Sequence, residues 1–225
     1  MPNFLYLDIE TIPASDPAVV NQIAADVRPP AQMKKAETIA EWEATKKAEA
    51  IAEAVAKTSF DGAYGQVCCV GWAWDDEPVS NVHWDESGEE GLLSLVSTML
   101  SQSRPSFEMP VIVGHYVADF DLRFLWQRAY VLGVRMPAWW PKDPKPWSRE
   151  VHDTMHMWAG AKGSISLDNL CRALGVAGKG NIDGSMVAGM FERGEHDAIA
   201  QYCMEDVERV RSCHRKMMHA LGEVA

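Results

Sequence analysis

The stretch YLDIET, residues 6–11, places two carboxylates at the end of an apolar run near the start of the chain. Side chains alternate between the two faces of a strand, so Asp8 and Glu10 share one face while Ile9 points to the other. Residues 4–10 begin with apolar side chains on both faces, which predicts a central strand that is covered on both sides. Two carboxylates about 7 Å apart along one strand face repel each other at low dielectric unless a cation is present. The stretch therefore predicts a site for a hard divalent cation with oxygen ligands, or else it is a chance pattern at a strand end.

A further carboxylate lies where an expected buried strand, residues 110–114, is followed by a helix at residues 119–132. Asp121 lies four residues before Leu125 in the apolar stripe of this helix, so its side chain leans towards the buried side. The positive end of the helix dipole tolerates a negative charge at this position. We interpret Asp119 as the cap of the helix and Asp121 as an inward-facing carboxylate.

A fourth carboxylate interrupts the apolar face of the long helix expected at residues 195–221. Asp206 lies in this face, and Tyr202 lies one turn before it on the same side. A buried carboxylate needs a partner, which is either a cation or an arginine in a salt bridge. The residues of this face are Ile199, Tyr202, Cys203, Asp206, Val207, Val210 and Cys213. The residues expected on the exposed side are Glu205, Glu208 and Arg209.

Together the three segments supply the patterns D-x-E, F-D and Y-x-x-x-D, in this order along the chain. The set resembles the DEDD superfamily of 3′–5′ exonucleases, in the subgroup whose third motif carries tyrosine. The subgroup with histidine would carry it one residue before Tyr202, where this chain has Gln201. Three further segments resemble stand-alone phage and bacterial proteins related to the exonuclease domain of family B DNA polymerases: HDTMHMW (152–158), SLDNLCRALGV (166–176) and IDGSMV (182–187).

This resemblance implies an α/β fold of the RNase H-like kind, with a mixed central sheet flanked by helices. It also implies a metal-dependent 3′–5′ exonuclease that uses two divalent cations, Mg²⁺ or Mn²⁺. Asp8 would bridge both cations, and Glu10 and Asp206 would complete the one that holds the attacking water. Asp121 would support the second cation. Tyr202 would position the water, since a phenol with a pKa near 10 is better suited to orienting it than to taking its proton.

Contacts with the substrate are implied as well. Thr11 and Ile12 follow the first motif at the place that packs on the terminal nucleotide in the family, and His115 and Tyr116 lie in the second motif. Many members have asparagine at the position of Tyr116. The expected substrate is the 3′ end of single-stranded DNA, from which 5′-mononucleotides are released. RNA as the substrate, or a non-catalytic module that binds 3′ ends, are the alternatives. We expect a monomer, with replication or repair proteins as candidate partners.

The composition suits a globular enzyme in a reducing compartment. The net charge of −11 argues against a protein that coats duplex DNA through a broad basic surface, but an acidic centre can meet phosphate through bound cations. Five cysteines without regular spacing predict buried free thiols. The chain has neither an apolar run of roughly 18 residues nor a signal-like N-terminus, so we expect no membrane contact and a cytoplasmic location, in the host if the chain is phage-encoded.

We expect one domain, residues 1–225, with a helical insertion at about residues 32–57. The insertion is rich in Ala, Glu and Lys, which favours either a solvated surface helix or an arm that helps to hold a substrate strand. A proline-rich loop at residues 136–148 holds three tryptophans, which either seal the loop onto the core or stack on bases. His152 and His156 have the spacing of a helical zinc site without further evident ligands, so we interpret them as structural. The other expected strands are at 66–73 and 79–84, and the other helices at 89–101, 166–174 and 185–192.

Overall fold

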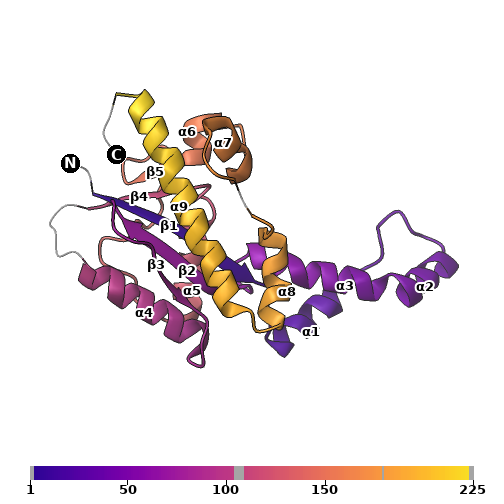
Figure 1. Ribbon diagram of the computed structural model, residues 1–225. Coiled ribbons are helices and arrows are strands. Elements are labelled where there is room, and N and C mark those ends of the chain that lie inside the picture. Colours follow the sequence, from indigo (N-terminus) through magenta and orange to yellow (C-terminus); the bar gives the residue numbers. More distant parts are fainter. Residues whose placement is uncertain (1–2, 104–108, 179, 223–225) are drawn as a thin grey trace.

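A computed structural model describes residues 3–103, 109–178 and 180–222 of the chain. Within these residues the centre is a mixed sheet of five strands in the order β3-β2-β1-β4-β5 (Figure 1). The strands are β1 (Phe4–Ile12), β2 (Gln66–Trp74), β3 (Ser80–His83), β4 (Val111–Gly114) and β5 (Val151–Asp153). β1 runs antiparallel to β2 and parallel to β4, and β4 runs parallel to β5. This arrangement confirms the expected α/β fold of the RNase H-like kind.

Helices cover both faces of this sheet. They are α4 (Gly88–Ser103), α5 (Asp121–Leu132), α6 (Thr154–Ala159), α7 (Leu167–Leu174), α8 (Val187–Glu192) and α9 (His196–Ala220), with a 3₁₀ turn, η2 (Gly184–Met186), before α8. On one face of β1, Leu5, Leu7 and Ile9 pack into a core with α4 and α5. On the other face, Phe4 and Tyr6 pack with α7 and α9, the long yellow helix that crosses the sheet in Figure 1. Burial on both faces explains why β1 is apolar on both sides and confirms its central position.

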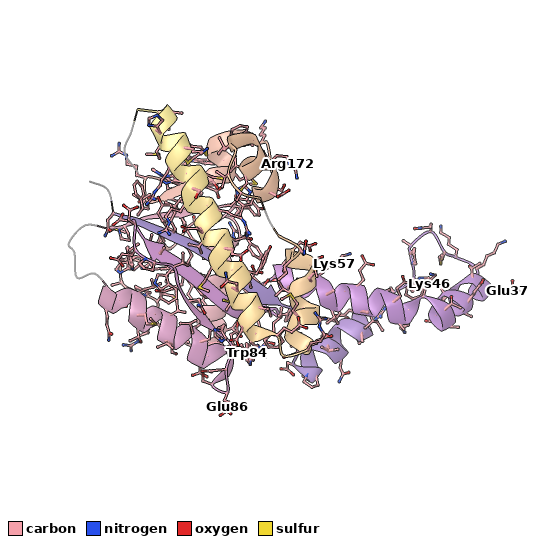
Figure 2. The ribbon with its side chains drawn as sticks, in the orientation of Figure 1. Glu37, Lys46, Lys57, Trp84, Glu86 and Arg172 are labelled. Carbon is pink, nitrogen blue, oxygen red and sulfur yellow. The ribbon has the colours of Figure 1, made fainter. Side chains whose placement is uncertain are left out.

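The chain segment that connects β1 to β2 contains a helical arm, residues 17–60, which extends away from the sheet (Figure 1). It consists of α1 (Pro17–Asp26), α2 (Ala36–Thr45), α3 (Lys47–Ala56) and a 3₁₀ turn, η1 (Lys57–Phe60). Figure 2 shows Lys57 near the root of the arm and Lys46 and Glu37 towards its far end. Within α1, α2 and α3 the only buried residue is Trp42. α2 and α3, which are rich in Ala and charged residues, therefore depend largely on the high helix propensity of Ala, Glu and Lys.

The arm differs from the single helix expected at residues 32–57. Residues 32–35 are not helical, and the chain turns at Lys46 (φ −122°), which separates α2 from α3. α1 is an additional helix that the sequence analysis missed. Its start has a recognisable pattern, because Asp16 precedes Pro17 and its side chain accepts a hydrogen bond from the backbone N–H of Ala18 at 2.8 Å.

The segment after residue 150 also contains elements that were not expected, β5 and α6. His152 lies in β5 and His156 in α6, so the two histidines do not share a helix as they would in a helical zinc site. The His152 ring contacts His214, with 2.9 Å between Nδ1 and Nε2, which agrees with a structural role. The remaining strands and helices match their expected positions to within about two residues.

One helix cap was assigned wrongly. α5 begins at Asp121, its N-cap is Phe120, and no side chain caps it. Asp119, the expected cap, instead lies 3.9 Å from the guanidinium of Arg123 (Oδ1 to Nη2). By contrast, α7 has a side-chain cap, Ser166, whose side chain accepts a hydrogen bond from the backbone N–H of Asn169.

The proline-rich loop is held to the core by two of its tryptophans. Trp140 is buried, and the ring of Trp139 packs edge-on against Trp74 at a centroid distance of 6.1 Å. Trp147 is exposed. Two of the three tryptophans therefore seal the loop onto the core.

The five cysteines are buried and free, as the sequence predicts. Two of them, Cys171 and Cys213, lie with their sulfur atoms 3.6 Å apart and share a hydrogen bond. Among the residues that the structure describes, no helix combines the length and the apolar character needed to cross a membrane.

Candidate metal centre

The candidate centre forms where β1 extends beyond β4. The pairing of the two strands ends at Tyr6, and within the described part of the chain the rest of β1 has no strand on that side. The N-terminus of α5 takes this place, and Asp121 Oδ1 accepts a hydrogen bond from the backbone N–H of Ile9 at 3.1 Å. Ile9 separates Asp8 from Glu10, so the bond brings Asp121 to the segment that carries both carboxylates. The buried, inward position expected for Asp121 is confirmed.

A β-bulge lies opposite the second carboxylate. Glu10 pairs with Cys69, but Thr11 pairs with Val67, so Cys68 is an extra residue on β2. The Cys68 thiol donates to the carbonyl oxygen of Glu10 at 3.4 Å. Bulges bend and twist strands locally and are common beside functional sites, where they redirect a side chain.

α9 brings the third segment to the same end of β1. Tyr202 and Asp206 are buried on α9, as expected from their place in its apolar face. The thiol of Cys203 lies between them along the chain and donates to the carbonyl oxygen of Asp8 at 3.5 Å. One potential ligand atom each from Asp8, Glu10 and Cys203 lies within 4.8 Å of the others. The segments that carry the three motifs therefore meet at one place.

Tyr202 lies in the electric field of these carboxylates. Burial raises its pKa most, and the charges of Asp206, Glu10 and Asp8, together with a hydrogen bond to Asp206, raise the pKa further. The hydroxyl therefore keeps its proton at neutral pH and can act as a hydrogen-bond donor.

The chemistry of the donor set suits a hard divalent cation. Burial raises the pKa of Asp121 above its usual range, and the charge of Asp153 adds to this, although backbone hydrogen bonds lower it. Burial and the neighbouring Cys69 raise the pKa of Cys203 well above its usual value, so its thiol stays protonated and is a poor ligand. The available ligands are therefore carboxylate oxygens, which Mg²⁺ and Mn²⁺ prefer and whose mutual repulsion such ions offset.

Arg209 does not lie on the exposed side of α9 as expected. Its side chain is 10% exposed, and its Nη1 lies 2.7 Å from Asp206 Oδ1. Its Nη2 lies 2.8 Å from Glu205 Oε2. The salt bridge that the sequence left open for Asp206 is therefore present, within a helix face that also carries Tyr202.

Two of the residues expected to contact the substrate continue β1 beyond Glu10. Thr11 Oγ1 donates to the carbonyl oxygen of Ser59 in the arm at 2.7 Å. Ile12 is buried in a cluster with residues of β2, α8 and α9. These contacts fasten the arm and α8 to the end of β1, while a role for either side chain in substrate binding stays a prediction.

The other two, His115 and Tyr116, follow β4. The Nδ1 atom of His115 lies 3.0 Å from Thr154 Oγ1, and its Nε2 atom lies 2.8 Å from the carbonyl oxygen of Ile165. Tyr116 is 44% exposed and has a left-handed backbone, with φ +65°. Asparagine adopts this conformation far more readily than tyrosine, so Tyr116 carries backbone strain at this position. Substrate contacts of both residues also stay predictions.

Asp153 is a supporting residue that the sequence analysis missed. It is fully buried, and its carboxylate accepts hydrogen bonds from the backbone N–H groups of Tyr116 (3.1 Å) and Ala118 (3.3 Å). The same carboxylate caps α6 through the N–H groups of Met155 and His156. Asp153 therefore holds the turn that leads from β4 to Asp121. An Asp directly before a helix is an N-cap pattern that could have identified it.

Fold and site together define an RNase H-like α/β protein with an acidic centre at the open edge of its first strand. The sequence profile of a family described as "Predicted 3'-5' exonuclease related to the exonuclease domain of PolB" matches residues 66–225. The chain therefore belongs to this family. Asp8 and Glu10 precede the matched range, whereas Asp121, Tyr202 and Asp206 lie within it.

Among solved structures, the family B DNA polymerase from the hyperthermophilic archaeon Pyrobaculum calidifontis is similar to the chain, with a TM-score of 0.57 and 15% sequence identity. The similarity covers 98% of this chain and 24% of the polymerase, so the chain spans about a quarter of that protein. At this level of identity the likeness concerns the fold. We found no curated protein with significant sequence similarity to the chain.

Proposed function

We propose that the chain is a metal-dependent 3′–5′ exonuclease that acts as a single monomeric domain and removes 5′-mononucleotides from the 3′ end of single-stranded DNA. Family membership supports exonuclease activity. The observation that carries the finer proposal is the placement of the carboxylates around the end of β1. Asp8 and Glu10 lie together on this strand, and their charges act with that of Asp206 on a protonated Tyr202. Asp121 accepts a hydrogen bond from the backbone N–H of Ile9, between Asp8 and Glu10.

The four carboxylates would hold two divalent cations, Mg²⁺ or Mn²⁺. Such a pair of cations stabilises charge on both the attacking and the leaving oxygen of a phosphodiester. The protein supplies the ligands from three elements whose spacing is set by the core, so little reorganisation is needed to bind them. Tyr202 Oη, which keeps its proton, would orient the attacking water by hydrogen bonding.

An exposed aromatic side chain beside the centre supports a single-stranded substrate. Phe60, at the root of the arm, is 74% exposed, and its ring centroid lies 6.4 Å from that of Phe120, the residue before Asp121. Ser59, next to Phe60, accepts the hydrogen bond from Thr11. Unpaired bases stack on such rings for about 1–3 kcal/mol each. The 3′-terminal base of a single strand therefore has a stacking surface next to the carboxylates.

A direct test uses single-stranded DNA labelled at its 5′ end, with Mg²⁺ or Mn²⁺, and a matched RNA. We expect a ladder of products shortened from the 3′ end, release of 5′-mononucleotides, and no shortening in EDTA. The Asp8→Ala variant loses this activity. A matched control, Asp143→Ala, removes an exposed carboxylate that pairs with Lys145 in the proline-rich loop and retains the activity.

Absence of shortening with either metal, or the same rate in the Asp8→Ala variant, contradicts the proposal. Preferential shortening of the RNA assigns the substrate to RNA instead of DNA. Binding of the labelled strand without any shortening identifies a binding module.

A further inference from the structure

Arg209 joins the candidate centre to a neighbouring loop. Its guanidinium donates through Nη1 to Asp206 Oδ1 at 2.7 Å, through Nη2 to Glu205 Oε2 at 2.8 Å and through Nε to the carbonyl oxygen of Gly178 at 3.3 Å. Each of its three nitrogen atoms therefore has a partner. Because a guanidinium stays charged at all ordinary pH values, Asp206 has a permanent cation beside it.

This contact bears directly on cation binding. The Asp206 side chain is 5% exposed and that of Arg209 is 10% exposed, so water screens the pair weakly. A divalent cation at Asp206 would share the carboxylate with the guanidinium, and the two positive charges would repel each other. We propose that Arg209 is a positioning residue that competes with divalent cations for Asp206 and keeps the cation affinity of the centre low. The inference rests on the proposed metal-dependent function.

The direction of the effect separates competition from simple structural support. If Arg209 only held Asp206 in place, its removal would disorder the carboxylate and weaken cation binding. If Arg209 competes for Asp206, removal of its charge strengthens cation binding, because the carboxylate is released and the repulsion disappears. Loss of structure alone does not produce tighter binding.

The test measures binding of Mn²⁺ to the full chain without nucleic acid, from the EPR signal of free Mn²⁺. We expect about tenfold tighter binding in Arg209→Gln than in the wild type, from the loss of one weakly screened positive charge. Arg209→Lys, which retains the charge, stays close to the wild type. We expect the same tighter Mn²⁺ binding in Arg209→Met as in Arg209→Gln, so a folding defect in one of the two variants does not decide the outcome.

Two controls assign the effect to Asp206. Arg193→Gln removes an equal charge from an exposed pair with Glu195, whose Nε–Oε1 distance is 2.7 Å, and leaves Mn²⁺ affinity unchanged. In the Asp206→Asn background, Arg209→Gln produces no gain, since the competition needs the carboxylate. Equal or weaker Mn²⁺ binding in folded Arg209→Gln and Arg209→Met overturns the inference while leaving the proposed function intact. A wild-type protein that binds no Mn²⁺ overturns both.

Discussion

Gly71 of β2 lies opposite Asp8 of β1, and its missing side chain lets α9 approach the sheet at this point. A Cβ atom on Gly71 would lie 3.0 Å from Cys203 Sγ and 3.2 Å from Val207 Cγ2. Both distances are tighter than ordinary contacts between carbon or sulfur atoms. The glycine therefore sets how closely α9 approaches β1. The candidate residues of α9 that this approach positions are Tyr202 and Asp206.

Replacing Gly71 with alanine is expected to push α9 away from the sheet. We expect a loss of about 1–3 kcal/mol in the free energy of unfolding, as is typical of overpacking, and a fall in the exonuclease rate. Urea unfolding and the 5′-label assay measure the two effects. Gly184→Ala is the matched control, since no atom would lie within 4 Å of its Cβ. A Gly71→Ala enzyme with the wild-type rate would show that this contact does not position the site.

Replacing Asp121 with asparagine is expected to separate stability from activity. The amide oxygen can still accept the hydrogen bond from Ile9, but the buried negative charge is gone. Because burial raises the pKa of Asp121, its charged form is disfavoured in the metal-free fold, and the variant is expected to be more stable in EDTA at neutral pH. The exonuclease rate is expected to fall on the order of 100-fold, because one carboxylate of the centre is lost.

Thermal unfolding in EDTA and the rate with saturating Mg²⁺ check both expectations for Asp121→Asn. The matched control is Asp119→Asn, two residues earlier, where the carboxylate makes one loose contact with Arg123. Neither property is expected to change in that control. Full activity in Asp121→Asn would remove this residue from the centre.

Replacing Tyr116 with asparagine is expected to stabilise the protein. Tyr116 has a left-handed backbone at φ +65°, which costs most residues about 1–2 kcal/mol and which asparagine tolerates. We therefore expect a gain of about 1 kcal/mol in the free energy of unfolding. Tyr130→Asn provides the contrast, because Tyr130 is also exposed but lies in α5, where it stacks on Trp126. That control is expected to lose stability, and a similar loss in Tyr116→Asn would contradict the strain argument.

The periodic parts of the molecule were predictable from the sequence. Asp8 and Glu10 share a strand face, and Asp206 lies in a helical stripe, so their inward positions follow from repeats of two and 3.6 residues. The inward position of Asp121 follows from its place at the start of a helix that comes after a buried strand. The pattern of the three motifs together led to the RNase H-like fold.

Features that depend on tertiary packing were not predictable in the same way. The sequence of the arm has the same Ala-rich and Glu-rich composition before and after Lys46, so nothing in this composition indicates that α2 ends there. The charge of Arg209 predicts an exposed position, and only its contacts with Asp206 and with the carbonyl oxygen of Gly178 show why its long side chain lies inward. The bulge at Cys68 depends on the pairing of two distant strands.

His214 is expected to make stability depend on pH. It is fully buried on α9, with Nδ1 3.1 Å from the Tyr6 hydroxyl of β1 and Nε2 2.9 Å from His152 Nδ1 of β5. Burial, followed by the charges of His152 and Arg215, lowers the pKa of His214 from 6.5 to about 3. Between these two pH values the unfolded chain binds a proton at this residue and the folded chain does not. The free energy of unfolding therefore falls as the pH decreases through this window, by up to about 1.4 kcal/mol per pH unit.

Substitution of His214 with glutamine is expected to remove this part of the pH dependence, because the amide does not titrate. The measurement compares urea unfolding of wild type and variant in EDTA from pH 7.5 to 4.5, and the difference between their slopes isolates the contribution of His214. His219→Gln, an exposed change at the end of the same helix, is the matched control for substituting a histidine of α9. Parallel slopes for wild type and His214→Gln would mean that the His214 ring takes up a proton as easily in the folded protein as in the unfolded chain.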